Sequence, residues 1–276
     1  MLFRHLAVVA TNFAFSFQVK MLAFITNRLQ PNQNLVHYST LSKPDVELRR
    51  MRSILDLPRP LAVIGISIRP ETSMIEAFKA AEIPVVLIDE QTDDASTVTT
   101  DNFAGGRLAA EHLLSRGKKH IAVVSGYTQI KGGFSNLQRL EGFKAGLATG
   151  GLTVAPDCLI EVLNYSYQEG HEAMTKWLKQ KTIIDAVFSC AGDDCALGML
   201  RAAQEHGVRI PADIAILGYD DMDTARLANP PLSTVRQPLQ EMAETAYRLA
   251  SNSGRDLVSH PKKAVLTPTL VVRAST

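Results

Sequence analysis

Short runs that are mostly apolar at consecutive positions alternate with amphipathic helical patterns along the chain, and this alternation constrains the fold most. Strands that carry apolar residues on both faces are typical of parallel sheets covered by helices on each side. We therefore expect an α/β fold with doubly wound parallel sheets. The apolar runs are residues 6–10, 35–38, 61–66, 85–88, 121–125, 159–162, 185–189 and 214–218.

The helical patterns between these runs have recognisable ends. Pro44 opens one helix, and Gly117 follows the last turn of another, where glycine often ends a helix. The predicted helices are residues 44–56, 70–81, 102–116, 138–149, 168–180, 193–206 and 239–251, and two short strands follow at 264–267 and 269–272.

A polar, glycine-rich segment at residues 126–136 separates two α/β series, which predicts two similar lobes. We place further chain crossings at 236–238 and near 260–261. The prediction is an N-terminal lobe of residues 1–125 plus 237–257 and a C-terminal lobe of 126–236 plus 258–276. The proline-punctuated stretch after Asp220 shows neither helical nor strand periodicity.

Charge and cysteine content narrow the function classes. The chain has 29 Lys and Arg against 28 Asp and Glu, so it lacks the basic excess of a free-standing nucleic-acid binder. Its three cysteines lack metal-ligand spacing and favour a reducing compartment over a disulfide framework. The apolar run 6–10 is too short for an export signal or a membrane span. We expect a cytoplasmic protein without a membrane partner.

Enzyme motifs are missing from the sequence. It contains no phosphate-binding G-x-x-x-x-G-K-[ST], no G-x-G-x-x-G, no G-x-S-x-G and no H-E-x-x-H. Asp220, Asp221 and Asp223 could hold Mg²⁺, although three close carboxylates in a turn are more often solvated. We expect no catalytic residue, cofactor or metal.

Candidate binding residues lie where the predicted strands end, because ligands of open parallel sheets bind beyond the carboxyl ends of the strands. Carboxylates and aromatic rings at these positions suit a polyhydroxylated or nitrogen-rich small molecule. The residues are Phe13, Phe15, Phe17, Asp89, Asp193 and Asp220.

Each candidate also has a purely structural interpretation. Asp89 and Asp193 could be turn or helix-capping residues. Phe15 and Phe17 could belong to the core. Arg139, on a helix, could be a solvated charge. These alternatives stay open from the residues alone.

Four ordered segments, 99–126, 138–147, 185–221 and 227–249, resemble the lactose/galactose-repressor (LacI/GalR) family of transcriptional regulators. The resemblance fades in residues 11–60, where TNFAFSFQVKML departs from the family's Asn-Pro-aromatic pattern and leaves the ligand's identity open. It implies a two-lobed fold like that of the type I periplasmic sugar-binding proteins, with a ligand cleft between the lobes. The ligand-binding positions that it implies are Asp101, Arg139, Tyr165, Asp193 and Asp220, with Phe15 and Phe17 matched more loosely.

The resemblance also implies a function: the effector-binding and dimerisation core of a repressor that senses a sugar or purine-like metabolite by lobe closure. Operator DNA would be bound only through a helix-turn-helix headpiece, which this sequence lacks. We expect a homodimer, with apolar segments 61–66 and 74–81 as candidate interface. Replacing Arg139 or Asp220 with alanine should weaken ligand binding and leave the fold nearly intact.

Two other function classes remain as alternatives. A transport-associated sugar-binding protein would need an export signal. A sugar- or nucleotide-processing enzyme would use Asp193 and Asp220 as an acid/base pair, without an evident nucleophile or metal.

Overall fold

The computed structural model divides the chain into two compact units, which we describe separately. Unit 1 consists of Met1–Thr100 and Pro238–Leu266, and unit 2 consists of Asp101–Gln237 and Thr267–Thr276. The structure describes residues 4–13, 15–58, 60–126, 134–251, 258 and 260–276. Within these residues no helix is long and apolar enough to cross a membrane.

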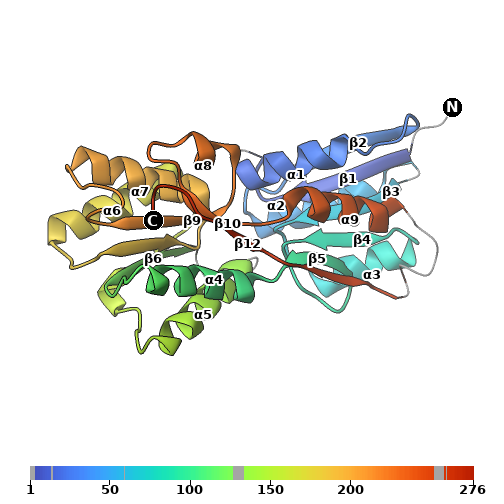
Figure 1. Ribbon diagram of the computed structural model, residues 1–276. Coiled ribbons are helices and arrows are strands. Elements are labelled where there is room, and N and C mark those ends of the chain that lie inside the picture. Colours follow the sequence, from blue (N-terminus) through green and yellow to red (C-terminus); the bar gives the residue numbers. More distant parts are fainter. Residues whose placement is uncertain (1–3, 14, 59, 127–133, 252–257, 259) are drawn as a thin grey trace. The chain divides into compact units, whose positions relative to one another are not determined.

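Unit 1 is a six-stranded parallel sheet with the strand order β11-β5-β4-β3-β1-β2 (Figure 1). Its strands are β1 (Arg4–Ala10), β2 (Gln33–Ser39), β3 (Pro60–Ile66), β4 (Val85–Ile88), β5 (Ser96–Thr100) and β11 (Lys263–Leu266). Its helices are α1 (Ser16–Thr26), α2 (Pro44–Leu55), α3 (Thr72–Ala80) and α9 (Leu239–Ser251).

Helices cover both faces of the unit 1 sheet. On one face, Met51 of α2 and Phe78 of α3 share a buried cluster with Val63 and Leu87 of the sheet. On the other face, α9 packs on α1 and on β3, β4 and β5. Consecutive strand residues therefore enter different cores, which explains the uninterrupted apolar runs.

Unit 2 is a second six-stranded sheet with the order β12-β10-β9-β8-β6-β7, parallel except for the antiparallel edge strand β12. Its strands are β6 (Ile121–Gly126), β7 (Leu159–Val162), β8 (Ala186–Ser189), β9 (Ala215–Asp220), β10 (Ser233–Arg236) and β12 (Thr269–Val271). Its helices are α4 (Asn102–Ser115), α5 (Phe134–Thr149), the 3-10 turn η1 (Pro156–Cys158), α6 (Tyr167–Gln180), α7 (Asp193–Glu205) and α8 (Asp223–Leu227).

In unit 2, α4 and α5 cover one face of the sheet and α6 and α7 cover the other (Figure 1). Glycines bring α4 and α5 into unusually close contact: a methyl group on Gly106 would lie 2.0 Å from the Arg139 carbonyl oxygen, and one on Gly142 would lie 2.0 Å from that of Phe103. This close packing places the start of α4 beside the side of α5 that carries Arg139.

The doubly wound α/β fold predicted from the apolar runs is confirmed, but the predicted elements did not include α1, β5, the 3-10 turn η1, α8 and β10. The sequence of β5, STVTT, is rich in hydroxyls, although all five of its residues are buried. The stretch after Asp220 was predicted to be a connection without regular structure, yet it contains α8 and β10.

The predicted lobe boundaries differ from the observed ones. The first boundary lies at 100/101 instead of 125/126, because α4 and β6 pack in unit 2. The last lies at 266/267 instead of 257/258, because β11 pairs with β5 of unit 1. Most of the glycine-rich break, residues 127–133, lies outside the described residues.

The large apolar side chains of the two segments named as candidate dimer interface are buried in unit 1. Residues 61–66 form β3, a central strand whose side chains are buried. In α3, Met74, Ile75 and Phe78 all pack into the core. Their apolar character is explained by the core of unit 1.

Candidate functional site

Arg139 is the centre of a buried polar network at the carboxyl-terminal edge of the unit 2 sheet. Only 5% of the residue is exposed. Its Nε donates a hydrogen bond to Asn102 Oδ1 (2.8 Å), and its Nη1 donates to the carbonyl oxygen of Cys190 (3.0 Å). Its Nη2 lies 3.9 Å from Asp220 Oδ1. Arg139 is therefore not a solvated helix charge.

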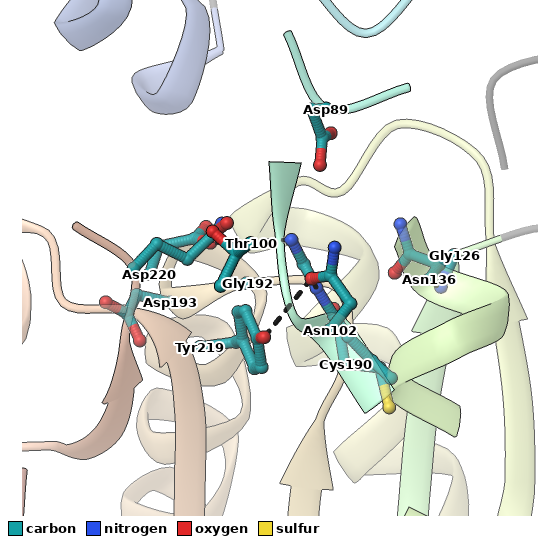
Figure 2. Close-up of polar contacts among 12 residues, drawn as sticks. Asp89, Thr100, Asn102, Gly126, Asn136, Cys190, Gly192, Asp193, Tyr219 and Asp220 are labelled. Carbon is teal, nitrogen blue, oxygen red and sulfur yellow. Dashed lines mark hydrogen bonds and ion pairs between the residues drawn. The ribbon is translucent and has the colours of Figure 1, made fainter. Parts of the chain in front are cut away.

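Tyr219 and Asn102 hold the guanidinium in place. The Arg139 Cζ atom lies 3.9 Å from the centroid of the Tyr219 ring, a cation–π contact. The Tyr219 hydroxyl donates to Asn102 Oδ1 at 3.2 Å (Figure 2), so this amide oxygen accepts two hydrogen bonds. Both residues come from element ends, Asn102 from the start of α4 and Tyr219 from the end of β9.

Asp220, the last residue of β9, has a half-buried carboxylate. Its Oδ1 accepts a hydrogen bond from Gln237 Nε2 at 2.6 Å. The backbone of Asp220 has φ +107°, which is uncommon for a residue other than glycine. The carboxylate lies against the start of α7, because a methyl group on Gly192 would come within 2.8 Å of Asp220 Oδ2.

Asp193 is engaged within the protein. It is almost completely buried, and its Oδ1 and Oδ2 accept hydrogen bonds from the Thr234 hydroxyl (2.6 Å) and the Met222 N–H (2.7 Å). Burial and the neighbouring Asp220 carboxylate raise the pKa of Asp193 well above its usual range. The side chain ties α7 to β10 and to the turn after β9.

Tyr165 lies beside the end of β6. A methyl group on Gly126 would come 2.3 Å from the Tyr165 ring, so only glycine leaves room for the ring there. The Gly126 N–H donates to Asn136 Oδ1 at 3.2 Å. Tyr165 also has a positive φ of +53°. This arrangement places an aromatic ring and an amide at the same sheet edge as Arg139.

Asp101 is the N-cap of α4. Its side chain accepts a hydrogen bond from the Ala104 N–H at 2.9 Å and is exposed. Capping explains an acidic residue at this position by itself. The capping hydrogen bond uses Oδ1 of Asp101 and not Oδ2.

Phe15 and Phe17 belong to unit 1, where Phe15 precedes α1 as its N-cap and Phe17 lies in its first turn. Both are half-buried. Phe13 makes an edge contact with the His37 ring, 5.1 Å between centroids. Asp89 follows β4 in the same unit and accepts a hydrogen bond from the Ser67 hydroxyl at 3.0 Å.

The acidic group at 220–223 does not resemble a metal site. Asp221 is paired with Arg236 (2.6 Å) and Arg273 (2.6 Å). No group of three His, Cys, Asp or Glu residues in the described part of the chain could hold a metal ion. Cys158, Cys190 and Cys195 are free thiols in buried positions, and burial raises the pKa of Cys195 to about 12.

Sequence reasoning did not identify Asn102, Asn136 or Gln237 as candidates. All three are neutral amides that lie in or next to segments used in the sequence analysis. Asn102 follows the candidate Asp101, Asn136 ends the glycine-rich segment, and Gln237 lies at a crossing between the two units. A carboxylate or an arginine can be identified as a candidate from the sequence because its charge needs a partner. A neutral amide can be identified only when the fold shows that it is buried and hydrogen-bonded.

Residues 110–276 match a family described as "Periplasmic binding protein-like domain". The chain is 34% identical over 206 residues to the HTH-type transcriptional repressor PurR of Erwinia tasmaniensis, covering 74% of this chain and 58% of the relative. It is 33% identical over 214 residues to the HTH-type transcriptional regulator DegA of Bacillus subtilis, covering 77% and 62%. The chain thus spans about three-fifths of the length of these relatives.

Solved structures share the fold along the whole chain. A complex of the transcriptional regulator CelR with cellobiose has a TM-score of 0.83 at 26% identity, covering 100% of this chain and 86% of that one. A putative LacI-family transcriptional regulator from Sanguibacter keddieii has a TM-score of 0.84 at 25% identity, covering 99% and 98%.

Proposed function

The chain belongs to the lactose/galactose-repressor (LacI/GalR) family, and we propose that it binds a small-molecule effector as the sensing part of a transcriptional repressor. The observation that carries this proposal is the Arg139–Asp220 pair, held at the carboxyl-terminal edge of the unit 2 sheet by Asn102, Tyr219 and Gln237. Ligands of open α/β sheets bind at this edge.

In this proposal the side chains of the edge have distinct tasks. Asp220, half-buried and fixed by Gln237, accepts hydrogen bonds from ligand hydroxyl or N–H groups. The Nη2 atom of Arg139 lies beside the Asp220 carboxylate. Its Nε and Nη1 atoms donate to Asn102 and to the Cys190 carbonyl, and these hydrogen bonds fix the guanidinium. The Tyr165 ring supplies a flat apolar face for a sugar or base. A side chain whose position is fixed before binding loses little conformational entropy when the ligand arrives.

The relatives support a regulator over the two alternatives. PurR, DegA and the Sanguibacter keddieii protein are transcriptional regulators. Their names therefore favour a regulator over an exported transport protein or an enzyme. The internal hydrogen bonds of Asp193 also weaken its candidacy as half of an acid/base pair.

Homodimerisation is part of the proposal, and so is binding of the whole regulator to operator DNA through a helix-turn-helix headpiece. Both are supported by the names of relatives, which include HTH-type repressors and a lac repressor dimer bound to operator. A dimer predicts a particle of twice 30.1 kDa by light scattering at micromolar concentration. A particle of 30.1 kDa alone would contradict the dimer.

A thermal-shift screen tests the proposed function, because a ligand that binds only the folded state raises the Tm. The compounds are monosaccharides, cellobiose, nucleosides and purine bases. Affinity for each hit is then compared between the parent chain and Asp220→Ala. Loss of a hydrogen bond to a charged group should weaken binding about 10- to 150-fold.

The control is Asp213→Ala, whose carboxylate lies on the surface paired with Arg209. It should bind the hit like the parent chain. If Asp220→Ala also binds like the parent, the site is placed wrongly. If nothing in the screen raises the Tm, the effector function loses its support.

A further inference from the structure

The loop between β7 and α6, residues 163–166, is folded around one carboxylate. Glu169, in the first turn of α6, accepts hydrogen bonds from the backbone N–H groups of Leu163 (2.9 Å) and Asn164 (3.0 Å). The N–H group (3.2 Å) and the hydroxyl (3.1 Å) of Ser166 donate to the same carboxylate. Three of the four residues of the loop therefore donate their N–H groups to a single side chain.

Helix capping accounts for only part of this arrangement. In a capping box, the N-cap serine and the glutamate three residues later bond to each other's backbone N–H groups, as Ser166 and Glu169 do. The hydrogen bonds from Leu163 and Asn164 are additional, because both residues precede the N-cap. Glu169 therefore holds the loop as well as the end of the helix.

The side chains at the start of the loop contribute little to its order. Leu163 is 58% exposed, and Asn164 is exposed as well. Tyr167, the residue that follows the loop, is also exposed. A segment with few buried apolar side chains depends on its backbone hydrogen bonds for its order. In this loop those hydrogen bonds converge on Glu169.

Tyr165 lies between two residues whose backbone is bonded to Glu169. Its φ of +53° is uncommon for a residue other than glycine, so its surroundings must hold this conformation. The N–H groups of Asn164 and Ser166, on either side of Tyr165, both donate to the Glu169 carboxylate. The backbone conformation of Tyr165 in turn directs its ring against Gly126 at the end of β6.

The strength of these hydrogen bonds depends on the charge of Glu169. Burial raises the pKa of Glu169, but the hydrogen bonds from the loop outweigh burial and lower this pKa below its ordinary value. The carboxylate is therefore ionised at neutral pH, and hydrogen bonds to a charged acceptor are stronger than those between neutral groups. A glutamine at this position would have one acceptor oxygen instead of two and would bring an NH2 donor to the loop.

From these contacts we propose that Glu169 is a positioning residue for effector binding: its hydrogen bonds to the loop hold the Tyr165 ring at the carboxyl-terminal edge of the unit 2 sheet. The role of the ring in binding rests on the proposed function. The ordering of the loop by Glu169 does not, because it follows from contacts within unit 2. Glu169 acts on the effector only through Tyr165.

Fluorine NMR of the chain labelled with 3-fluorotyrosine tests the ordering of the loop without a ligand. The chain has six tyrosines, and the variant Tyr165→Phe identifies the Tyr165 resonance. The variant Glu169→Gln should move or broaden the Tyr165 resonance and leave that of Tyr219, in the core of unit 2, unchanged. An unchanged Tyr165 resonance would overturn the proposal.

Two controls separate positioning from loss of the fold and from a general effect of charge. Glutamine also serves at this position of a capping box, so Glu169→Gln should unfold cooperatively in urea when followed by Trp177 fluorescence. The matched control is Glu172→Gln on the same helix, where the exposed carboxylate accepts from Gln168 at 2.8 Å. It should leave the Tyr165 resonance unchanged. An equal effect of both variants on that resonance would overturn the assignment to Glu169.

A ligand from the screen tests the role in binding by calorimetry. Tyr165→Ala and Glu169→Gln should each weaken binding about two- to twelvefold, the contribution of one aromatic contact. The double variant should bind no more weakly than Tyr165→Ala alone, because the effect of Glu169 passes through the ring. Additive losses would overturn the proposal.

The two measurements fail in different ways. If Tyr165→Ala binds the ligand like the parent chain, or if the screen yields no ligand, the proposed function loses the ring or its support, and Glu169 has no role in binding. The fluorine spectra still decide whether Glu169 orders the loop. If those spectra do not change with Glu169→Gln, the inference is wrong even where the effector function holds.

Discussion

Replacing Arg139 with alanine should destabilise unit 2 by about 3–5 kcal/mol, the usual cost of removing one partner of a buried charge pair. The substitution leaves the Cys190 carbonyl without this donor, takes the counter-charge from beside Asp220 and removes the cation from the Tyr219 ring. A charge-assisted hydrogen bond alone contributes about 1.5–3 kcal/mol, and these contributions are not additive because they share one side chain. The expectation from the sequence that this variant keeps its fold nearly intact is therefore revised.

The single tryptophan of the chain makes the assay specific for unit 2. Trp177 is buried in the core of that unit, where its indole N–H donates to the Asp157 carbonyl. Urea unfolding followed by tryptophan fluorescence reports on unit 2, and circular dichroism reports on both units. Arg139→Ala should lower the fluorescence midpoint strongly.

The matched control is Arg107→Ala on α4. Arg107 pairs with Glu111 in an exposed ion pair one helical turn away, so its loss should cost less than about 0.5 kcal/mol. A change below about 1 kcal/mol for Arg139→Ala, similar to this control, would refute the reasoning. Adding Asp220→Asn to Arg139→Ala should recover part of the loss, because the uncompensated carboxylate is then gone.

Three further predictions concern the same unit and use the same fluorescence assay. Because the pKa of Asp193 is raised on folding, the folded protein keeps a proton that the unfolded chain releases. The free energy of unfolding should therefore fall as the pH rises above about 4. The variant Asp193→Asn should make the free energy of unfolding less dependent on pH. An unchanged slope would mean that Asp193 is ionised in the fold. Gly106→Ala places a methyl group 2.0 Å from the Arg139 carbonyl and should cost about 1–3 kcal/mol or more by forcing α4 and α5 apart; a neutral result would contradict their close packing. Ser275→Ala removes a buried hydroxyl that donates to the Ile216 carbonyl of β9 and accepts from the Ser233 N–H at the start of β10. The free energy of unfolding should fall by about 2–4 kcal/mol. An unchanged urea midpoint would mean that water replaces the hydroxyl.

The parallel strands were predictable because their apolar residues reach two cores, one on each side of the sheet. β5 and β10 were not, since their buried hydroxyls depend on partners supplied by the fold. Ser96 accepts from the Lys262 N–H, and the Thr234 hydroxyl donates to Asp193. A local pattern carries no information about partners so distant in sequence.

The candidate site shows the same limit. Arg139 and Asp220 were noticed through their charge and the family resemblance, but whether Arg139 was buried or solvated stayed open. Its amide partner Asn102 is 37 residues away and on another helix. Only the packing of α4 on α5 decides between the two interpretations.

The interleaved order of the two units has a consequence for synthesis on the ribosome. Unit 1 needs α9 and β11, which are made after nearly all of unit 2, and unit 2 in turn needs β12. A nascent chain that has been made as far as residue 237 therefore presents a first sheet that lacks both an edge strand and a covering helix. The sheet of unit 1 can be completed only after residue 266 has been made, and the sheet of unit 2 only after residue 271 has been made. For the same reason, exchanging either unit between relatives requires several recombination points instead of one.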